Sequence, residues 1–168
     1  MTPPTATDHF REILDAIVRE MRLYSPSFVL RPPAAESDLT DLRRAAVTEL
    51  GVDLPEPYLD LLRLADGVQF DGVIVYASHR APGDDAHTAP PDLVGSNLSL
   101  READAFSDYV VFGGADDLLL VLHRPTGEYQ ALDPFGLDAD EVFDSFDALI
   151  LWAYGKRLSG LQPANGVA

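Results

Sequence analysis

The sequence contains no cysteine, which excludes disulfides, cysteine-based zinc sites and thiol chemistry. It also lacks an apolar run approaching the roughly 18 residues that a membrane span requires. Residues 1–6 carry neither the basic segment nor the apolar segment of a secretory signal peptide. We therefore expect a cytoplasmic protein with no membrane partner.

Cations are scarce. The 168 residues include 12 basic and 28 acidic side chains, giving a net charge of −16. Residues 66–168 alone hold 5 basic and 17 acidic side chains, a net charge of −12. Such a field repels nucleic acid and anionic lipid, so we expect no nucleic-acid partner, and it attracts a basic protein. Solubility alone is the alternative explanation of this charge.

Motifs for metals, cofactors and catalysis are missing or incomplete. The four histidines lack the spacing of zinc ligands, and residues 138–141 lack the glycine and closing glutamate of a calcium loop. Gly113-Gly114 has no phosphate-binding lysine, and no Gly-x-Ser-x-Gly occurs. We expect no metal, no cofactor and no enzymatic activity. An acid–base hydrolase built from two of the many carboxylates stays open as a third hypothesis.

The first part of the chain predicts three helices. Apolar residues at helical spacing indicate helices over residues 8–23, 37–50 and 56–65, with Asp8 and Ser37 as the first two N-caps. Gly51 ends the second helix, and Asp66-Gly67 is expected to cap the third. Residues 1–7 predict a flexible tail, and the connector 24–33 contains a candidate short strand at 28–30.

The remainder predicts a sheet and a closing helix. β-Branched, aromatic and apolar runs indicate strands at 73–76, 109–112, 118–123 and 128–133, the last two joined as a hairpin. Residues 78–91 and 136–144 read as loops, 113–117 as a turn, and 98–105 as a short helix. Ser145 caps a final helix to about residue 158, and 159–168 predict a second flexible tail.

Together these elements predict one α+β domain over residues 1–168. N-terminal helices pack on a central, mainly antiparallel sheet, and a C-terminal helix closes the fold. Strands and helices alternate too rarely for a doubly wound sheet.

The order of these motifs resembles the SUKH (Smi/Knr-like) superfamily, especially its YrhA-like branch. The motifs that carry the likeness are helix 39–50, Leu54-Pro55, Tyr58, Leu61-Leu62, Asp66-Gly67, Phe70-Asp71-Gly72, Ile74 to Tyr76, Val111-Phe112-Gly113, Asp116-Asp117 and 143–146. The family typically has Asn-Gly where this chain has Asp66-Gly67, and the 78–91 loop matches no family pattern. The resemblance covers most of residues 36–152 and implies a partner-binding module without catalytic machinery.

Many bacterial members of that superfamily act as immunity proteins that neutralise a toxin, often a nuclease. The resemblance therefore implies that the partner is a cognate toxin or another basic protein. Binding would neutralise a toxin by blocking it sterically and electrostatically. The candidate binding residues are acidic residues in loops, expected around one rim of the sheet: Asp84, Asp85, Asp116, Asp117, Asp138, Asp140 and Glu141. The alternative is a scaffold or regulatory module that binds a protein other than a toxin. The sequence leaves the oligomeric state open.

Overall fold

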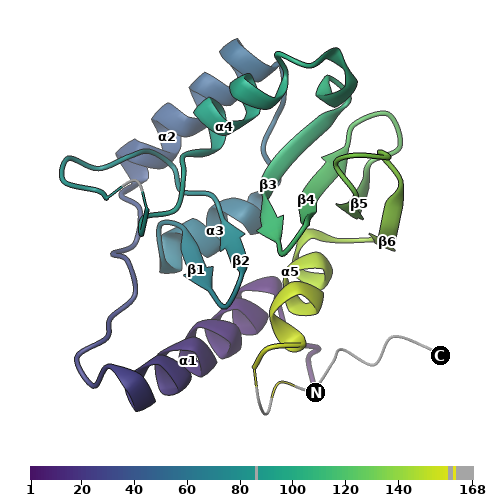
Figure 1. The fold of residues 1–168 in the computed structure, drawn as a ribbon. Helices are drawn as coiled ribbons and strands as arrows, with labels where there is room; N and C mark the ends of the chain where they lie inside the picture. Colours follow the sequence, from purple (N-terminus) through teal and green to yellow (C-terminus); the bar gives the residue numbers. More distant parts are fainter. Residues whose placement is uncertain (86, 159–160, 162–168) are drawn as a thin grey trace.

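The computed structural model describes residues 1–85, 87–158 and 161. These residues form an α+β fold with a six-stranded antiparallel sheet (Figure 1). The helices are α1 (Ala6–Tyr24), α2 (Glu36–Ala45), α3 (Glu56–Leu64), α4 (Leu93–Leu100) and α5 (Phe146–Gly155). A π-helical turn, η1 (Ala46–Leu50), continues α2, and a 3-10 turn, η2 (Asp104–Phe106), follows α4. The strands are β1 (Val68–Phe70), β2 (Val73–Val75), β3 (Tyr109–Ala115), β4 (Leu118–His123), β5 (Glu128–Leu132) and β6 (Ala139–Phe143).

The sheet is a meander in which each strand pairs with the next along the chain, from β1 to β6. Helices α1, α3 and α5 contact one another, and α5 also packs on β5 and β6. Tyr58 of α3, Phe112 of β3 and Phe146 of α5 meet in this core, with ring centroids 5.0–5.6 Å apart. The predicted α+β architecture with a closing helix is confirmed.

The two faces of the sheet are covered unequally. Val110 and Phe112 enter the main core, whereas Val111 between them joins a small cluster with Val121 and Leu132. Successive side chains of a strand point to opposite faces, so both faces carry buried residues. Helix α4 lies against β3, where the buried Asn97 side chain donates to the Val111 carbonyl and accepts from its N–H, at 2.7 and 2.8 Å.

Several predicted helix boundaries are wrong because capping interactions lie elsewhere. Helix α1 begins at Ala6 because Thr5 and Asp8 form a capping box. Residues 6 and 7, predicted as part of the tail, therefore belong to the helix. Helix α2 begins at Glu36, where the Asp38 carboxylate accepts from the Ala35 N–H. The predicted helix 98–105 is replaced by α4, which begins at Leu93 because Asp92 caps it. Helix α5 begins after Ser145 as predicted but ends at Gly155.

Helix α3 ends before the predicted cap. Ala65, in an extended conformation, is its C-cap, so Asp66-Gly67 does not cap the helix. Gly67 does have the positive φ that a cap would need, +84°, but it leads into β1, and a Cβ there would lie 3.0 Å from that of Ala77. Gly51 ends η1 in the left-handed conformation, as predicted.

Several strand predictions are also wrong. The three-residue strand β1 was not predicted, and β6 occupies part of the predicted acidic loop. β3 runs through Gly113 and Gly114, where a turn was predicted. Glycine is needed at position 113 because β2 lies so close that an added Cβ would be 1.8 Å from the Ile74 carbonyl oxygen. Residues 28–30 form no strand. The predicted tail 159–168 lies outside the described residues, apart from Leu161.

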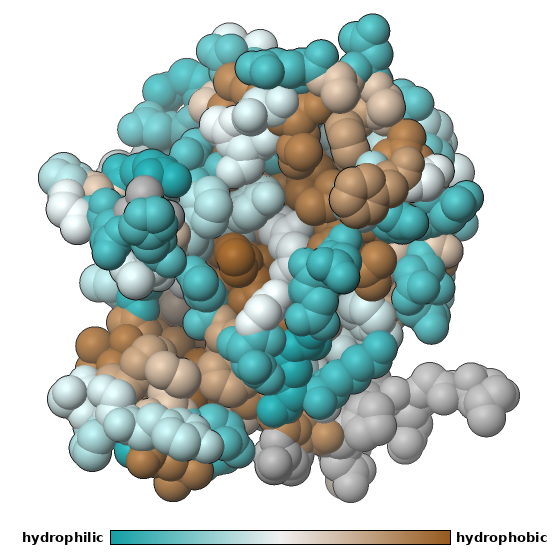
Figure 2. Space-filling view, viewed as in Figure 1, coloured by the Kyte–Doolittle hydropathy of each residue, from teal (hydrophilic) through white to brown (hydrophobic). Residues whose placement is uncertain are grey.

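Apart from the terminal Met1, the large apolar side chains that are exposed among the described residues are Leu23, Tyr24, Val29, Val47, Leu98, Phe135 and Val142. Phe135, in the β5–β6 connection, is 92% exposed. Leu23, Tyr24 and Val29 are 75%, 85% and 72% exposed where α1 ends. Figure 2 shows hydrophobic side chains at the lower left, around the end of α1, beside hydrophilic surface in front of α5.

Candidate functional site

The strand register brings three connections to the same end of the sheet. Val73 of β2 pairs with Ala115, which pairs with Leu118 at the start of β4. At that end of β4, Leu119 pairs with Leu132, which in turn pairs with Ala139 at the start of β6. The β1–β2, β3–β4 and β5–β6 connections therefore all leave the sheet at this end.

Each of these connections carries aspartates. We call the resulting set the acidic end, and it consists of Asp71, Asp116, Asp117, Asp133, Asp138 and Asp140. All except the half-buried Asp133 are exposed. Two of these positions have positive φ, Asp71 at 46° and Asp116 at 53°, in the tight turns that short antiparallel hairpins require. Local turn geometry and sheet register thus concentrate negative charge in one place.

The acidic end contains four of the seven predicted binding residues. Asp116 and Asp117 form the β3–β4 turn, Asp138 precedes β6, and Asp140 lies near the start of β6. Glu141 lies beside them on β6, paired with Ala131, and is exposed. Asp140 and Glu141 are therefore strand residues at the open edge of the sheet, and not loop residues as predicted.

Asp84 and Asp85 lie apart from this group. They belong to the connection between β2 and α4, which Figure 1 shows on the opposite side of the fold from β6. The Arg31 guanidinium donates to both carboxylate oxygens of Asp84, at 2.9 and 3.3 Å. The hydrogen bonds from Arg31 and the Ala81 N–H lower the pKa of Asp84. Asp85 accepts from the His87 N–H at 2.9 Å. The prediction that all seven acidic residues lie around one rim of the sheet is therefore wrong for Asp84 and Asp85.

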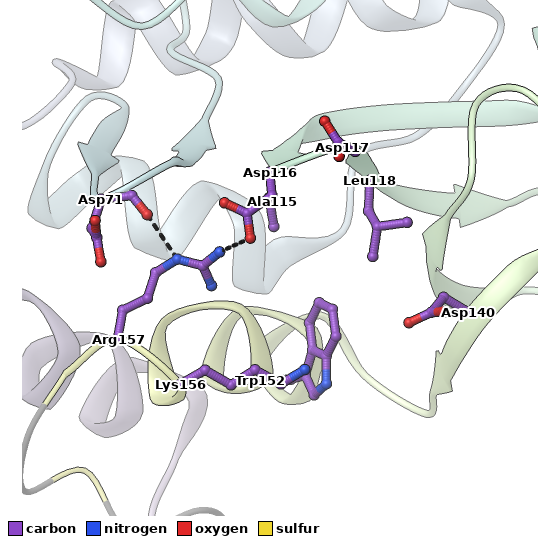
Figure 3. A pocket seen from close by; sticks show the side chains of 9 residues that line it. All are labelled: Asp71, Ala115, Asp116, Asp117, Leu118, Asp140, Trp152, Lys156 and Arg157. Atoms are coloured by element: carbon purple, nitrogen blue, oxygen red, sulfur yellow. Dashed lines mark hydrogen bonds and ion pairs between the residues drawn. The ribbon is translucent and has the colours of Figure 1, made fainter.

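A hollow of about 630 Å³ opens at the acidic end (Figure 3). It is lined by Asp71, Ala115, Asp116, Asp117, Leu118, Asp140, Trp152, Lys156 and Arg157. Trp152 projects from α5 into the space between Leu118 and Asp140. The Lys156 ammonium lies 4.2 Å from the centroid of the Trp152 ring, a cation–π contact. Among the residues that the structure describes, neither a histidine nor a hydroxyl side chain lines this hollow.

Arg157 fixes the end of α5 against the two neighbouring turns. Its guanidinium donates to the Asp71 and Ala153 carbonyls, each at 2.7 Å, and forms an ion pair with Asp116. The Arg157 side chain is only 13% exposed, whereas that of Asp116 is 69% exposed. Lys156 and Arg157 are the two cations that line the hollow, so the acidic end keeps a large excess of negative charge.

Sequence reasoning assigned other roles to these residues. By local pattern alone, Asp71 is a turn residue, Trp152 flanks the apolar face of the final helix, and Lys156-Arg157 suit the dipole at its C-terminal end. Their local patterns support those roles, and only the register shows that they surround one hollow. A tryptophan one turn before two cations at the end of a helix is the only signal of this arrangement in the sequence.

A second polar group, built from Asp66, Ser78 and His79, superficially resembles a nucleophile site. The Ser78 hydroxyl lies 2.7 Å from Asp66 Oδ2 and 2.9 Å from His79 Nδ1. The carboxylate can only accept, so the hydroxyl donates to Asp66 and the imidazole donates to Ser78. In this arrangement His79 is a donor to Ser78 and does not act as its base. The Ser78 N–H also donates to Asp66, at 2.7 Å, which ties the β2–α4 connection to the end of α3.

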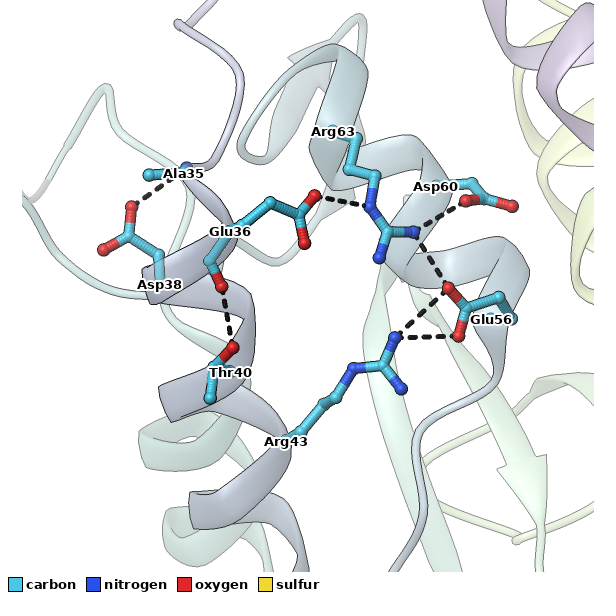
Figure 4. Close-up of polar contacts among 8 residues, drawn as sticks. All are labelled: Ala35, Glu36, Asp38, Thr40, Arg43, Glu56, Asp60 and Arg63. Carbon is cyan, nitrogen blue, oxygen red and sulfur yellow. Dashed lines mark hydrogen bonds and ion pairs between the residues drawn. The ribbon is translucent and has the colours of Figure 1, made fainter.

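A third acidic group, on α2 and α3, is neutralised by arginines (Figure 4). Arg63 donates to Glu36, Glu56 and Asp60 at 2.8–2.9 Å. Arg43 donates to both oxygens of Glu56, and these arginines lower the pKa of Glu56. We call this set, Glu36, Arg43, Glu56, Asp60 and Arg63, the paired cluster. The carboxylates of this cluster are ion-paired with arginines of the same molecule.

Comparison with models of known protein families, and with curated proteins, finds no match for this chain. Over residues 1–85, 87–158 and 161, no group of three or more His, Asp or Glu side chains is arranged to hold a metal ion. In the same residues, no helix has the length and apolar character needed to cross a membrane. The acidic end is the site that the geometry itself distinguishes.

Proposed function

We propose that this chain is a non-catalytic protein-binding module that holds a basic partner against its acidic end. The observation that carries the proposal is the sheet register, which gathers aspartates of the β1–β2 turn, the β3–β4 turn and the start of β6 around one hollow. Exposed carboxylates of one sign steer a cationic surface into contact and fix its orientation. Phe135, 92% exposed among them, supplies the kind of aromatic anchor that contributes most to protein interfaces.

The partner in this proposal is a cognate nuclease-type toxin, and the chain is its immunity protein. A nuclease must present cations to the phosphates of nucleic acid, so an acidic surface can occupy the same cations. Binding then blocks the toxin both sterically and electrostatically. The resemblance of the sequence to the SUKH superfamily supports this choice over a basic partner of another kind.

Binding to the basic proteins encoded beside the gene tests the proposal. Calorimetry at low salt should detect a complex that the variant Asp117→Lys/Asp140→Lys weakens about 100-fold, because like charges then face each other. The matched control is Glu12→Lys/Asp15→Lys, which changes the net charge equally on the exposed side of α1. It should weaken binding less than about threefold. Equal losses in both variants, or no binding to any of these proteins, would contradict the proposal.

Co-expression separates a toxin from another basic partner. A toxin expressed alone should stop growth, and the wild-type chain should restore it. The Asp117→Lys/Asp140→Lys variant should not restore growth, whereas Glu12→Lys/Asp15→Lys should. A partner that binds at the acidic end but never affects growth would instead support the scaffold or regulatory function.

A further inference from the structure

The end of α1 presents an apolar patch made of Leu23, Tyr24 and Val29. Helix α1 ends at Tyr24, and the following turn folds back, with the Phe28 N–H donating to the Ser25 carbonyl at 2.9 Å. The Arg22 side chain donates to the Phe28 carbonyl at 3.2 Å and holds this turn in place. We call these three exposed side chains the α1 patch. Apolar side chains gathered in this way are typical of interaction surfaces.

A second hollow, of about 340 Å³, adjoins the α1 patch. Its apolar wall consists of Met21 and Tyr24 of α1 and Phe70 of β1. Its remaining lining is Glu20, Asp71 and Arg157. Asp71 and Arg157 also line the hollow at the acidic end, so the two hollows are contiguous. The Arg157 guanidinium, bonded to the Asp71 carbonyl, stands between them.

We propose that the two hollows form one docking surface and that the wall formed by Met21, Tyr24 and Phe70, together with the adjoining α1 patch, receives an apolar side chain of the same basic partner. This inference rests on the proposed function and adds to it the chemistry of the partner. The partner presents arginine or lysine side chains to the acidic end and, beside them, an aliphatic or aromatic side chain to the wall formed by Met21, Tyr24 and Phe70. Burial of that side chain supplies affinity that salt does not screen.

The charge of the chain argues against a second copy as the occupant. Two copies would each bring a net charge of −16, and their acidic ends would face each other or lie close together. A cationic partner is attracted by the same field. The apolar part of the surface then discriminates among basic partners, which charge alone does poorly.

Selection of displayed random peptides on the immobilised full-length chain tests the inference without a known partner. Peptides enriched at low salt should combine arginine or lysine with a neighbouring leucine, phenylalanine or similar residue. Synthetic copies of these peptides are then titrated against wild type and three variants. The variants are Leu23→Ser/Tyr24→Ser in the patch, Asp117→Asn/Asp140→Asn at the acidic end, and Val47→Ser, an exposed apolar residue elsewhere, as control.

We expect Leu23→Ser/Tyr24→Ser to weaken peptide binding about tenfold at both low and high salt. Asp117→Asn/Asp140→Asn should weaken it at low salt and flatten its salt dependence, and Val47→Ser should leave it unchanged. No enrichment, enrichment of peptides without apolar residues, or wild-type affinity in the patch variant would overturn the inference. The proposed function fails separately, if the acidic-end variant binds the basic proteins encoded beside the gene as wild type does.

Discussion

The paired cluster and the acidic end both consist of carboxylates and cations, but they differ in how completely the charges are paired. On α2 and α3, Glu36, Glu56 and Asp60 share two arginines that come from the same helices. At the acidic end, four aspartates and two cations line the hollow, and among the residues that the structure describes Asp116 is the one of these aspartates that forms an ion pair. The paired cluster has its counter-charges inside the molecule, whereas the acidic end leaves most of its charge available to another molecule.

This difference supports the acidic end as the proposed binding surface, which composition alone could not locate. A net charge of −16 gives no location, and any single exposed aspartate can be a solvated turn residue. Repulsion among clustered carboxylates costs stability, so a fold that needed acidity only for solubility gains nothing by concentrating it. Four measurements of stability test the contrast between the two regions.

The largest expected effect comes from Gly113→Ala. The added Cβ would lie 1.8 Å from the Ile74 carbonyl oxygen, so β2 and β3 must separate. We expect a loss of about 3 kcal/mol or more in the free energy of unfolding, measured by urea denaturation. Because this contact sets the register that brings Asp71 beside Asp116, any folded fraction should also lose the acidic end. The neighbouring Gly114→Ala, with 3.3 Å to the Leu118 carbonyl, is the milder control.

Arg63→Ala should break the paired cluster. It removes the common partner of three carboxylates, and the Arg63 side chain is 31% exposed, so screening by water limits the effect. We expect a loss of about 1–2 kcal/mol in unfolding free energy, larger at low salt. Arg44→Ala, which removes one exposed pair with Asp41, should cost less than about 0.5 kcal/mol. Equal effects of the two substitutions would mean that the cluster is not a stabilising network.

The substitution Asp147→Asn tests whether a paired carboxylate makes the free energy of unfolding depend on pH. Burial opposes ionisation of Asp147, but hydrogen bonds from Ser145 and His9 outweigh it and lower its pKa. A lowered pKa in the folded state means that the stabilisation is complete above the ordinary value of 3.8 and is lost as pH falls through the folded-state pKa. At pH 7 we expect the variant to lose about 1 kcal/mol, with less difference from wild type in acid. A difference that grew in acid would contradict this account.

The smallest expected effect has the opposite sign. Asp117→Asn/Asp140→Asn removes two exposed carboxylates from a repulsive group and should raise the unfolding free energy by about 0.5 kcal/mol at low salt. The gain should disappear at high salt, where exposed charges are screened. Glu56→Gln in the paired cluster should instead lower stability, because Arg43 and Arg63 lose a charged acceptor. Thermal unfolding at two salt concentrations measures both.

The elements predicted well from sequence are those whose signals are local. Helix α3 follows from Pro57 in its first turn and apolar residues at helical spacing, and the β4–β5 hairpin from two apolar runs around Gly127. Helix α5 begins after Ser145 because that side chain accepts from the Ala148 N–H. Each of these signals acts within a few residues.

The elements missed depend on distant partners. β1 is too short to have a pattern, and it exists because Val68 and Phe70 pair with β2. β6 reads as an acidic loop, and its strand conformation comes from pairing with β5. Gly113 and Gly114 resemble a turn, yet the close approach of β2 requires glycine within β3.

Local sequence signals were sufficient to predict helices α1, α2, α3 and α5, the central strands and the α+β class, and composition gives the net charge of −16. Short-range hydrogen bonds, side-chain spacing and composition are enough for these, because each is a property of neighbouring residues or of a sum. The tertiary structure was needed to show which carboxylates lie close together. Strand register joins positions 71, 116 and 140 around one hollow and leaves 84 with Arg31, because pairing between strands connects residues without regard to their separation along the chain.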